Sequence, residues 1–140
     1  MRFFREASAR RIISSARDLS LGGLAVALFR STEGQEGSSN LSVRLRPEFV
    51  HGMTQVWKRE DLLFFGETNG CAVIGVEEEH RPAVEDVATR IGIELRHAGT
   101  TTESDFDFVS FVVKADRART AFGDGLSRFF QVGPPAPVGQ

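Results

Sequence analysis

Asp18–Phe29 reads DLSLGGLAVALF, and this stretch decides the fold of the chain around it. It begins as a turn and continues, after Gly23, as about three turns of strong apolar helix formers. Adjacent glycines let a backbone approach a ligand closely, and a helix N-terminus presents free N–H groups and partial positive charge. Two interpretations stay open, a phosphate seat and the commoner structural turn ahead of a capped helix.

The candidate substrate- and phosphate-binding residues follow from this segment. Ser20 is placed to cap the helix or to bond a phosphate oxygen, and Asp18 to orient the loop or bind a metal ion. The candidates in this segment are Asp18, Ser20, Gly22, Gly23 and Leu24.

Hydrophobic periodicity predicts the other elements. The predicted helices are a short one within 1–16 running into an extended stretch at 12–16, one from Pro82 to a stop at Gly92, and one over 118–130, with a helical turn over 49–57. The predicted strands are 41–46 with one face in water, 71–76 apolar on both faces and so central, 93–97, and a buried one over 106–113. The predicted loops are 31–40, 66–70 and 100–105.

This order of elements predicts an α+β fold in which helices pack on a mixed β-sheet. A chain of 140 residues is expected to form one domain, over 1–132, followed by a Pro/Gly-rich tail over 133–140.

Composition restricts the class of protein. Hydrophobic residues at 41%, a net charge of −2 and no basic run beyond two residues argue for a globular chain that does not bind nucleic acid. Fifteen of the 17 cationic residues are Arg, which suits anionic ligands but also follows from high-GC coding. Without a long apolar span or a signal peptide, we expect no membrane partner and a cytoplasmic location.

The cysteine and the three histidines indicate no further functional site. Cys71 lies in an apolar run and is expected to be a buried, inert thiol. His51, His80 and His97 lack metal-ligand spacing, so no metal site is predicted. No nucleophile signature occurs, and no catalytic residue is proposed.

Two motifs resemble a known family. Residues 14–28 read SSARDLSLGGLAVAL and resemble the S-A-H-D-x-S-D-G-G-L-A-V-A-L segment of the phosphoribosylformylglycinamidine synthase family. Residues 63–76 read LFFGETNGCAVIGV and are similar to that family's L-F-[SG]-E-x-x-G-R-x-[LV]-V-x-V hairpin. With the helix, strand and Gly-Thr that follow, the resemblance covers about residues 10–113. It implies the fold of the C-terminal domain of the aminoimidazole ribonucleotide synthetase superfamily.

The resemblance also has departures. Arg17 stands where the family has His, Leu21 replaces its second acid, and Cys71 stands where Arg is frequent. Glu67, in the hairpin turn, matches a position that could touch substrate or metal, although a Glu bonded to backbone N–H groups would serve the turn equally well. Arg17 and Glu67 are therefore added as further site contacts.

The resemblance implies a domain of an ATP-dependent C–N ligase of purine biosynthesis that holds the substrate's ribose phosphate. ATP and magnesium would bind mainly outside this chain, on an N-terminal ATP-binding domain, with a glutamine amidotransferase as a further partner. The domain alone is expected to be inactive, and self-association is expected where the partner is missing. The alternatives are a non-catalytic binding or assembly domain, or part of a thiamine-phosphate kinase, selenophosphate synthetase or hydrogenase maturation factor.

Overall fold

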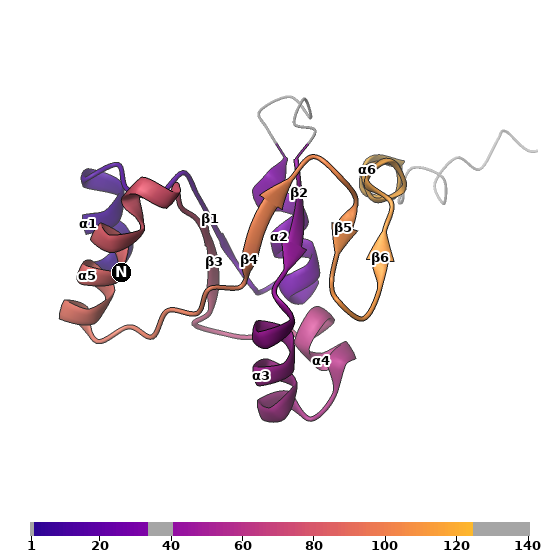
Figure 1. Cartoon of the computed structure of the whole chain (residues 1–140), viewed down its shortest axis with the longest axis horizontal. Helices are drawn as coiled ribbons and strands as arrows, with labels where there is room; N and C mark the ends of the chain where they lie inside the picture. Colours follow the sequence, from indigo (N-terminus) through magenta and orange to yellow (C-terminus); the bar gives the residue numbers. More distant parts are fainter. Residues whose placement is uncertain (1, 34–40, 125–140) are drawn as a thin grey trace, which may run out of the picture.

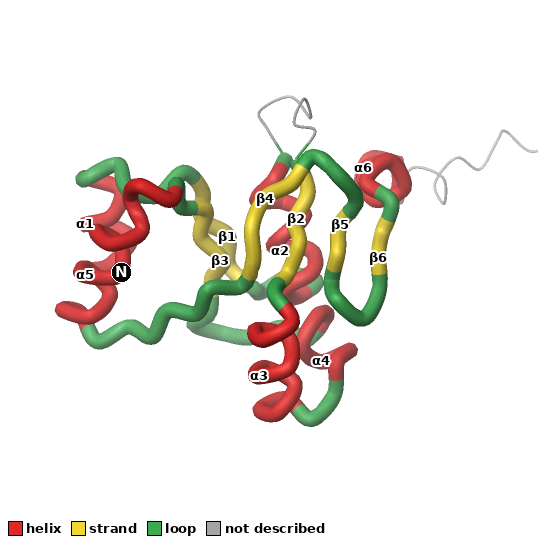
Figure 2. The backbone as a smooth tube through the Cα atoms, viewed as in Figure 1, coloured by secondary structure: helices red, strands yellow, loops and turns green. Residues whose placement is uncertain are grey.

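The computed structural model describes residues 2–33 and 41–124, which form an α+β fold (Figures 1 and 2). The helices are α1 (Arg2–Ala9), α2 (Gly23–Thr32), α3 (Pro47–Trp57), α4 (Glu60–Phe65), the 3-10 turn η2 (Glu78–His80), α5 (Arg81–Ile91) and α6 (Ala115–Asp124). The strands are β1 (Ser15–Asp18), β2 (Ser42–Leu45), β3 (Ala72–Gly75), β4 (Gly99–Thr102), β5 (Phe106–Asp107) and β6 (Val112–Val113).

The strands form two sheets. The larger has the order β4-β2-β5-β6, in which β2 runs antiparallel to β4 and parallel to β5, so the expected mixed sheet is confirmed. The smaller is an antiparallel ribbon of β1 and β3, with Ser15 opposite Gly75. The prediction that 71–76 forms a central strand is therefore wrong.

Two hydrophobic cores explain why β3 is apolar on both faces. Val73 packs against the larger core, whereas Ile74 packs against the smaller one. The ribbon thus lies between the cores, and each of its faces meets a different one. A strand that is apolar on both faces normally lies in the centre of a sheet. Here both faces are apolar because the strand lies between two cores.

The larger core joins α2, α3 and α4 to the four-stranded sheet. Leu24 and Leu28 of α2 are buried with Val43 and Leu45 of β2 and with Phe64 of α4. Pro47 at the first turn of α3 stops β2 and starts this helix, because proline lacks the N–H that a strand would use. The helix runs through Trp57, whereas the sequence predicted only a helical turn.

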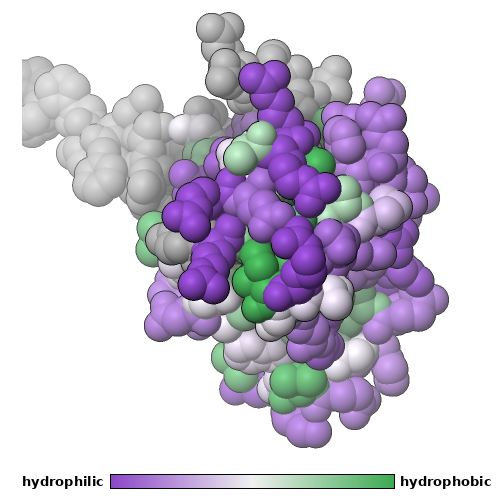
Figure 3. Space-filling view, turned by 90° about the vertical axis from the view of Figure 1, so that its left-hand side faces the viewer, coloured by the Kyte–Doolittle hydropathy of each residue, from purple (hydrophilic) through white to green (hydrophobic). Residues whose placement is uncertain are grey.

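The smaller core holds α1 against α5, beside the ribbon (Figure 1). Phe3 and Ala7 face Val84, Val87 and Ala88. Viewed from this side, the surface is mostly hydrophilic, with a small hydrophobic area near its centre (Figure 3). No helix in the described ranges is long and apolar enough to cross a bilayer.

The predicted strand over 93–97 is wrong. These residues adopt no regular structure, and the strand begins later, at Gly99. Gly99 pairs with Leu45, and the Arg46 amide bonds to the Ala98 carbonyl at 2.9 Å. Because Pro47 then turns the chain into α3, β2 offers no partner beyond Ala98.

The predicted strand over 106–113 is a hairpin of β5 and β6. Val109 has a φ of 73°, and its N–H donates to the Asp107 carboxylate at 2.9 Å, which closes the turn. The aromatic rings of Phe108 and Phe111 stack at 4.8 Å between the two short strands.

Two predictions of burial are also wrong. Cys71 is exposed, directly before β3, where its carbonyl accepts a hydrogen bond from the Leu19 amide. Ser42, on the predicted water face of β2, is fully buried and donates its hydroxyl to the Thr102 and Ser104 carbonyls. The predicted tail over 133–140 and the end of the last helix lie outside the described residues.

Candidate phosphate-binding loop

The loop between β1 and α2 contains the two glycines that the sequence singled out. Gly22 is the N-cap of α2, with φ 76° and ψ 12°, and Gly23 follows with φ 66°. Both lie in the left-handed region that favours glycine. Among the described residues no side chain caps this helix, so the N–H groups of its first turn lack a side-chain acceptor there.

The structure assigns both glycines a packing role as well. A Cβ on Gly23 would lie 2.7–2.8 Å from backbone atoms of Phe64, Phe65 and Gly66. A Cβ on Gly22 would lie 2.5 Å from Cγ2 of Val26. A substitution at Gly23 would therefore disturb the contact between α2 and α4, whereas one at Gly22 would press on the Val26 side chain within α2.

Ser20 does not cap α2. Its hydroxyl donates to the Asp18 carboxylate at 2.5 Å, a short contact within the loop. Asp18 and Ser20 are thus bonded to each other within the loop. The helix cap is Gly22 instead, whose left-handed conformation turns the chain into α2 without help from a side chain.

The loop is tied to the segment 66–71 by two backbone hydrogen bonds. The Leu19 amide donates to the Cys71 carbonyl, and the Thr68 amide donates to the Leu19 carbonyl, both at 3.2 Å. Glu67, next to Thr68, is thereby brought beside the loop with its side chain exposed. The two motifs of the sequence therefore meet in space, as one site would require.

The side chains of Arg17 and Leu24 lie in different environments, one exposed and one buried. Arg17 is exposed on β1 and donates to the Ala16 carbonyl at 3.2 Å. Leu24 is only 4% exposed and belongs to the larger core, so its side chain serves packing. Leu21, in contrast, is 71% exposed beside the glycines.

Phe65 is a neighbour of the loop that sequence reasoning did not select. Its backbone abuts Gly23, and its side chain is 55% exposed at the end of α4. Leu62, one turn earlier, is also exposed, so α4 presents an apolar face near the loop. Phe65 belongs to the family motif that begins at Leu63, and Leu62 directly precedes that motif. This motif was the sequence signal that could have selected them.

A second cluster of polar groups lies at η2. The ligand-type atoms of Glu77, Glu79 and His80 lie within 4.8 Å of one another. The acidic run ahead of His80 was its only sequence signal. These groups are solvent-accessible, and exposed acidic groups often gather without an ion, so we assign no metal site to them.

Comparison with known proteins gives matches over most of the chain. The family model described as AIR synthase related protein, C-terminal domain, matches residues 1–111. Phosphoribosylformylglycinamidine synthase subunit PurL of Aquifex aeolicus (strain VF5) is 31% identical over 73% of this chain and 12% of its own length. The protein of the same name from Wolinella succinogenes is 27% identical over 93% of this chain and 16% of its own length.

The chain therefore spans less than a fifth of the length of either relative. No solved structure matches it.

Proposed function

Since the chain belongs to the family of AIR synthase related proteins, C-terminal domain, we propose that it binds the phosphate group of a purine-pathway substrate. The proposed whole enzyme is a phosphoribosylformylglycinamidine synthase-like, ATP-dependent ligase. The names of the two relatives support this choice within the family. Such a domain would hold the substrate while the chemistry takes place on another part of the enzyme.

One observation carries the proposal, the start of α2, where two left-handed glycines stand and no described side chain caps the helix. The N–H groups and the partial positive charge of a helix N-terminus favour an anion. Ser20 adds a hydroxyl that can exchange its bond to Asp18 for a bond to a phosphate oxygen. We therefore place the ribose phosphate of the substrate at this loop.

In the proposed reaction, the substrate's amide oxygen would take the γ-phosphoryl group of ATP, with ADP leaving, and ammonia would then attack the carbon and displace phosphate. The described residues near the loop supply the carboxylates of Asp18 and Glu67, and no group of three ligating side chains gathers there. From the resemblance to the synthase family, we propose that ATP and magnesium bind mainly outside this chain, on an N-terminal domain, with a glutamine amidotransferase supplying the ammonia.

A second candidate function is a non-catalytic binding or assembly domain of the same fold. The packing of Gly23 against α4 supports it, because the fold requires this glycine whether or not a ligand binds. Leu21, exposed where the family has an acid, supports it too. The two functions differ in whether the loop binds phosphate.

The test is a titration of the 15N-labelled chain with inorganic phosphate and with ribose 5-phosphate, followed by NMR. We expect the amide signals of Gly22, Gly23 and Leu24 to shift together, with saturation at millimolar ligand. Ser20→Ala should weaken binding about two- to tenfold, the effect of one hydrogen bond. Ser110→Ala is the matched control, because Ser110 also donates its hydroxyl to a carboxylate, that of Glu60.

Absence of shifts at the loop amides, in a chain that remains folded, would contradict phosphate binding and favour the assembly domain. Equal losses of affinity in Ser20→Ala and Ser110→Ala would contradict the placement of the phosphate beside Ser20. Shifts confined to other amides would do the same.

A further inference from the structure

The connection from α5 to β4 is an exposed stretch with a strand-like sequence. Every residue from 92 to 97 is exposed, and Ile93–His97 alternates in character without belonging to either sheet. In the described part of the chain, two amides at the start of this stretch have backbone partners: Gly92 donates to the Thr89 carbonyl at 3.2 Å and Ile93 to the Ala88 carbonyl at 2.8 Å. The backbone groups of Glu94–His97 are thus free to form a ladder with another strand.

The side chains of Glu94 and Arg96 already lie on one side of this stretch. Arg96 donates through Nε to Glu94 at 2.7 Å, as expected for residues two apart in an extended chain. Ile93, 40% exposed, and Leu95, 38% exposed, alternate with them in the sequence and would lie on the other face of an extended chain. One face therefore carries an acid and a base, and the other carries apolar groups open to solvent.

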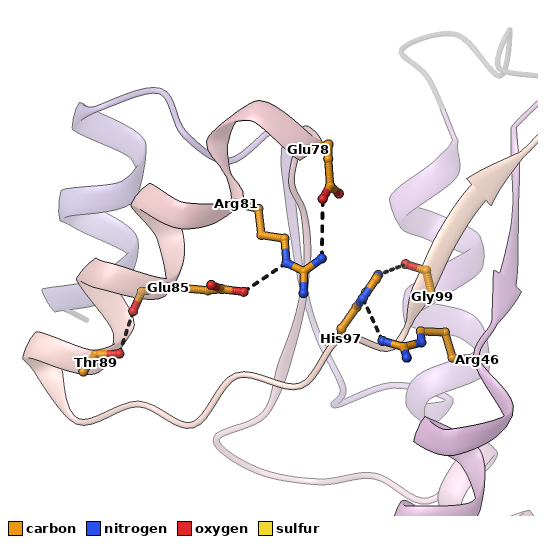
Figure 4. Close-up of polar contacts among 7 residues, drawn as sticks. All are labelled: Arg46, Glu78, Arg81, Glu85, Thr89, His97 and Gly99. Carbon is orange, nitrogen blue, oxygen red and sulfur yellow. Dashed lines mark hydrogen bonds and ion pairs between the residues drawn. The ribbon is translucent and has the colours of Figure 1, made fainter.

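The C-terminal end of the stretch is held in place. His97 contacts Nη1 of Arg46 through Nδ1 and the Gly99 carbonyl through Nε2, each at 3.1 Å (Figure 4). Arg96 also reaches Sδ of Met53 on α3 at 3.3 Å. These contacts anchor the extended conformation to α3 and to β4, which lowers the entropic cost of pairing.

We propose that Ile93–His97 pairs with the same stretch of a second copy of this chain, antiparallel and about a two-fold axis at Leu95. In that register Glu94 lies opposite Arg96 of the second copy, and Arg96 opposite its Glu94. Leu95 meets its own equivalent, and Ile93 meets His97. Directly opposed opposite charges stabilise an antiparallel pair, and like charges destabilise it.

Charge complementarity selects a second copy over another partner. The order acid, Leu, base is complementary to itself only when the strands are antiparallel, which is the arrangement that a two-fold axis produces. In a parallel pair in register, each acid would face an acid. The apolar face of α4, at Leu62 and Phe65, has no such self-complementary charge pattern and is the rival surface.

The test is sedimentation of the 140-residue chain over a range of concentrations. We expect reversible dimers, a dissociation constant raised about tenfold or more by Glu94→Arg or Arg96→Glu, and recovery in the double reversal. Most tellingly, an equimolar mixture of the two single variants should form a heterodimer, because two bases then face two acids. The matched control, Asp61→Arg, breaks the exposed Arg59–Asp61 pair of the same spacing and should leave association unchanged.

Circular dichroism of each variant checks that it is folded. A chain that stays monomeric at the highest concentration overturns the proposal. A mixture of the two folded single variants that fails to associate overturns it as well. An association that is lost in Phe65→Lys but kept in Glu94→Arg would also overturn it and would assign the contact to α4.

Discussion

Gly23 shows how one residue can be fixed by packing even where its sequence context indicates a ligand. Its left-handed φ of 66° already disfavours any other residue. The neighbouring backbone of Phe64, Phe65 and Gly66 leaves no room for a Cβ. Backbone atoms cannot move aside as a flexible side chain can, so the strain of a substitution would spread to α2 and α4.

We expect Gly23→Ala to lower the free energy of unfolding by about 2–4 kcal/mol, from overpacking together with backbone strain. Gly52→Ala is the control, because a Cβ at Gly52 meets nothing within 4 Å and the residue lies inside α3. It should stabilise the chain by about 0.5–1 kcal/mol through helix propensity. Urea denaturation measures both. A Gly23→Ala chain as stable as the parent would contradict the packing role.

The start of α6 depends on a carboxylate from the preceding hairpin. Asp105 accepts hydrogen bonds from Nζ of Lys114 at 2.8 Å and from the Ala115 amide at 3.1 Å. The Lys114 ammonium first, and the Ala115 amide second, hold the pKa of Asp105 below its ordinary value. Ala115 is the first residue of the helix, so this carboxylate anchors its N-terminus to β5.

A carboxyl whose pKa is lowered by folding binds protons more weakly in the folded state. Its stabilising effect is therefore present near neutrality and lost as the pH falls, from about pH 5 downward through the folded pKa. We expect the parent to be more stable than Asp105→Asn at pH 7, with the difference in urea midpoint shrinking toward pH 3. Asp116→Asn, at another acid in the first turn of α6, is the control. A difference independent of pH would contradict this role of Asp105.

The two hydrophobic cores divide the described part of the chain into two regions. The smaller core contains α1 and α5, and the larger contains α2, α3, α4 and the four-stranded sheet. The β1–β3 ribbon and the exposed stretch at 92–97 connect them (Figure 1). Regions with separate cores can open independently, with different free energies of opening.

A matched pair of buried phenylalanines tests this division by hydrogen exchange. Phe3 is 3% exposed in the smaller core, and Phe64 is 1% exposed in the larger. Each Phe→Ala change should cost about 3–5 kcal/mol. Phe3→Ala should speed exchange in α1 and α5 while α2 stays protected, and Phe64→Ala should speed exchange in α2 and the sheet. Faster exchange throughout the chain in both variants would show one cooperative unit instead.

Local signals predicted several parts of this structure correctly. The paired glycines ahead of α2, and Pro82 and Gly92 around α5, act through the conformation of neighbouring residues. The position of the candidate loop at the start of α2 was predictable because it depends on the conformation of two adjacent glycines. The end of β2 at Pro47 was equally local, but α3 behind it was underestimated because its apolar pattern is weak.

The features that the sequence did not predict depend on contacts between segments that are distant in the chain. The alternation in 93–97 is that of a strand, yet the turn at Pro47 removes the partner that it would need within the chain. The two faces of β3 are apolar because each packs against a different core. A Cβ added at Gly23 would clash only because α4 lies against this residue. Sequence by itself determined the family, the class of fold and the place of the glycine loop, since these depend on motifs and on helix and turn chemistry. The tertiary structure decided which edges are paired and which residues are buried, because both depend on segments that are distant in the chain.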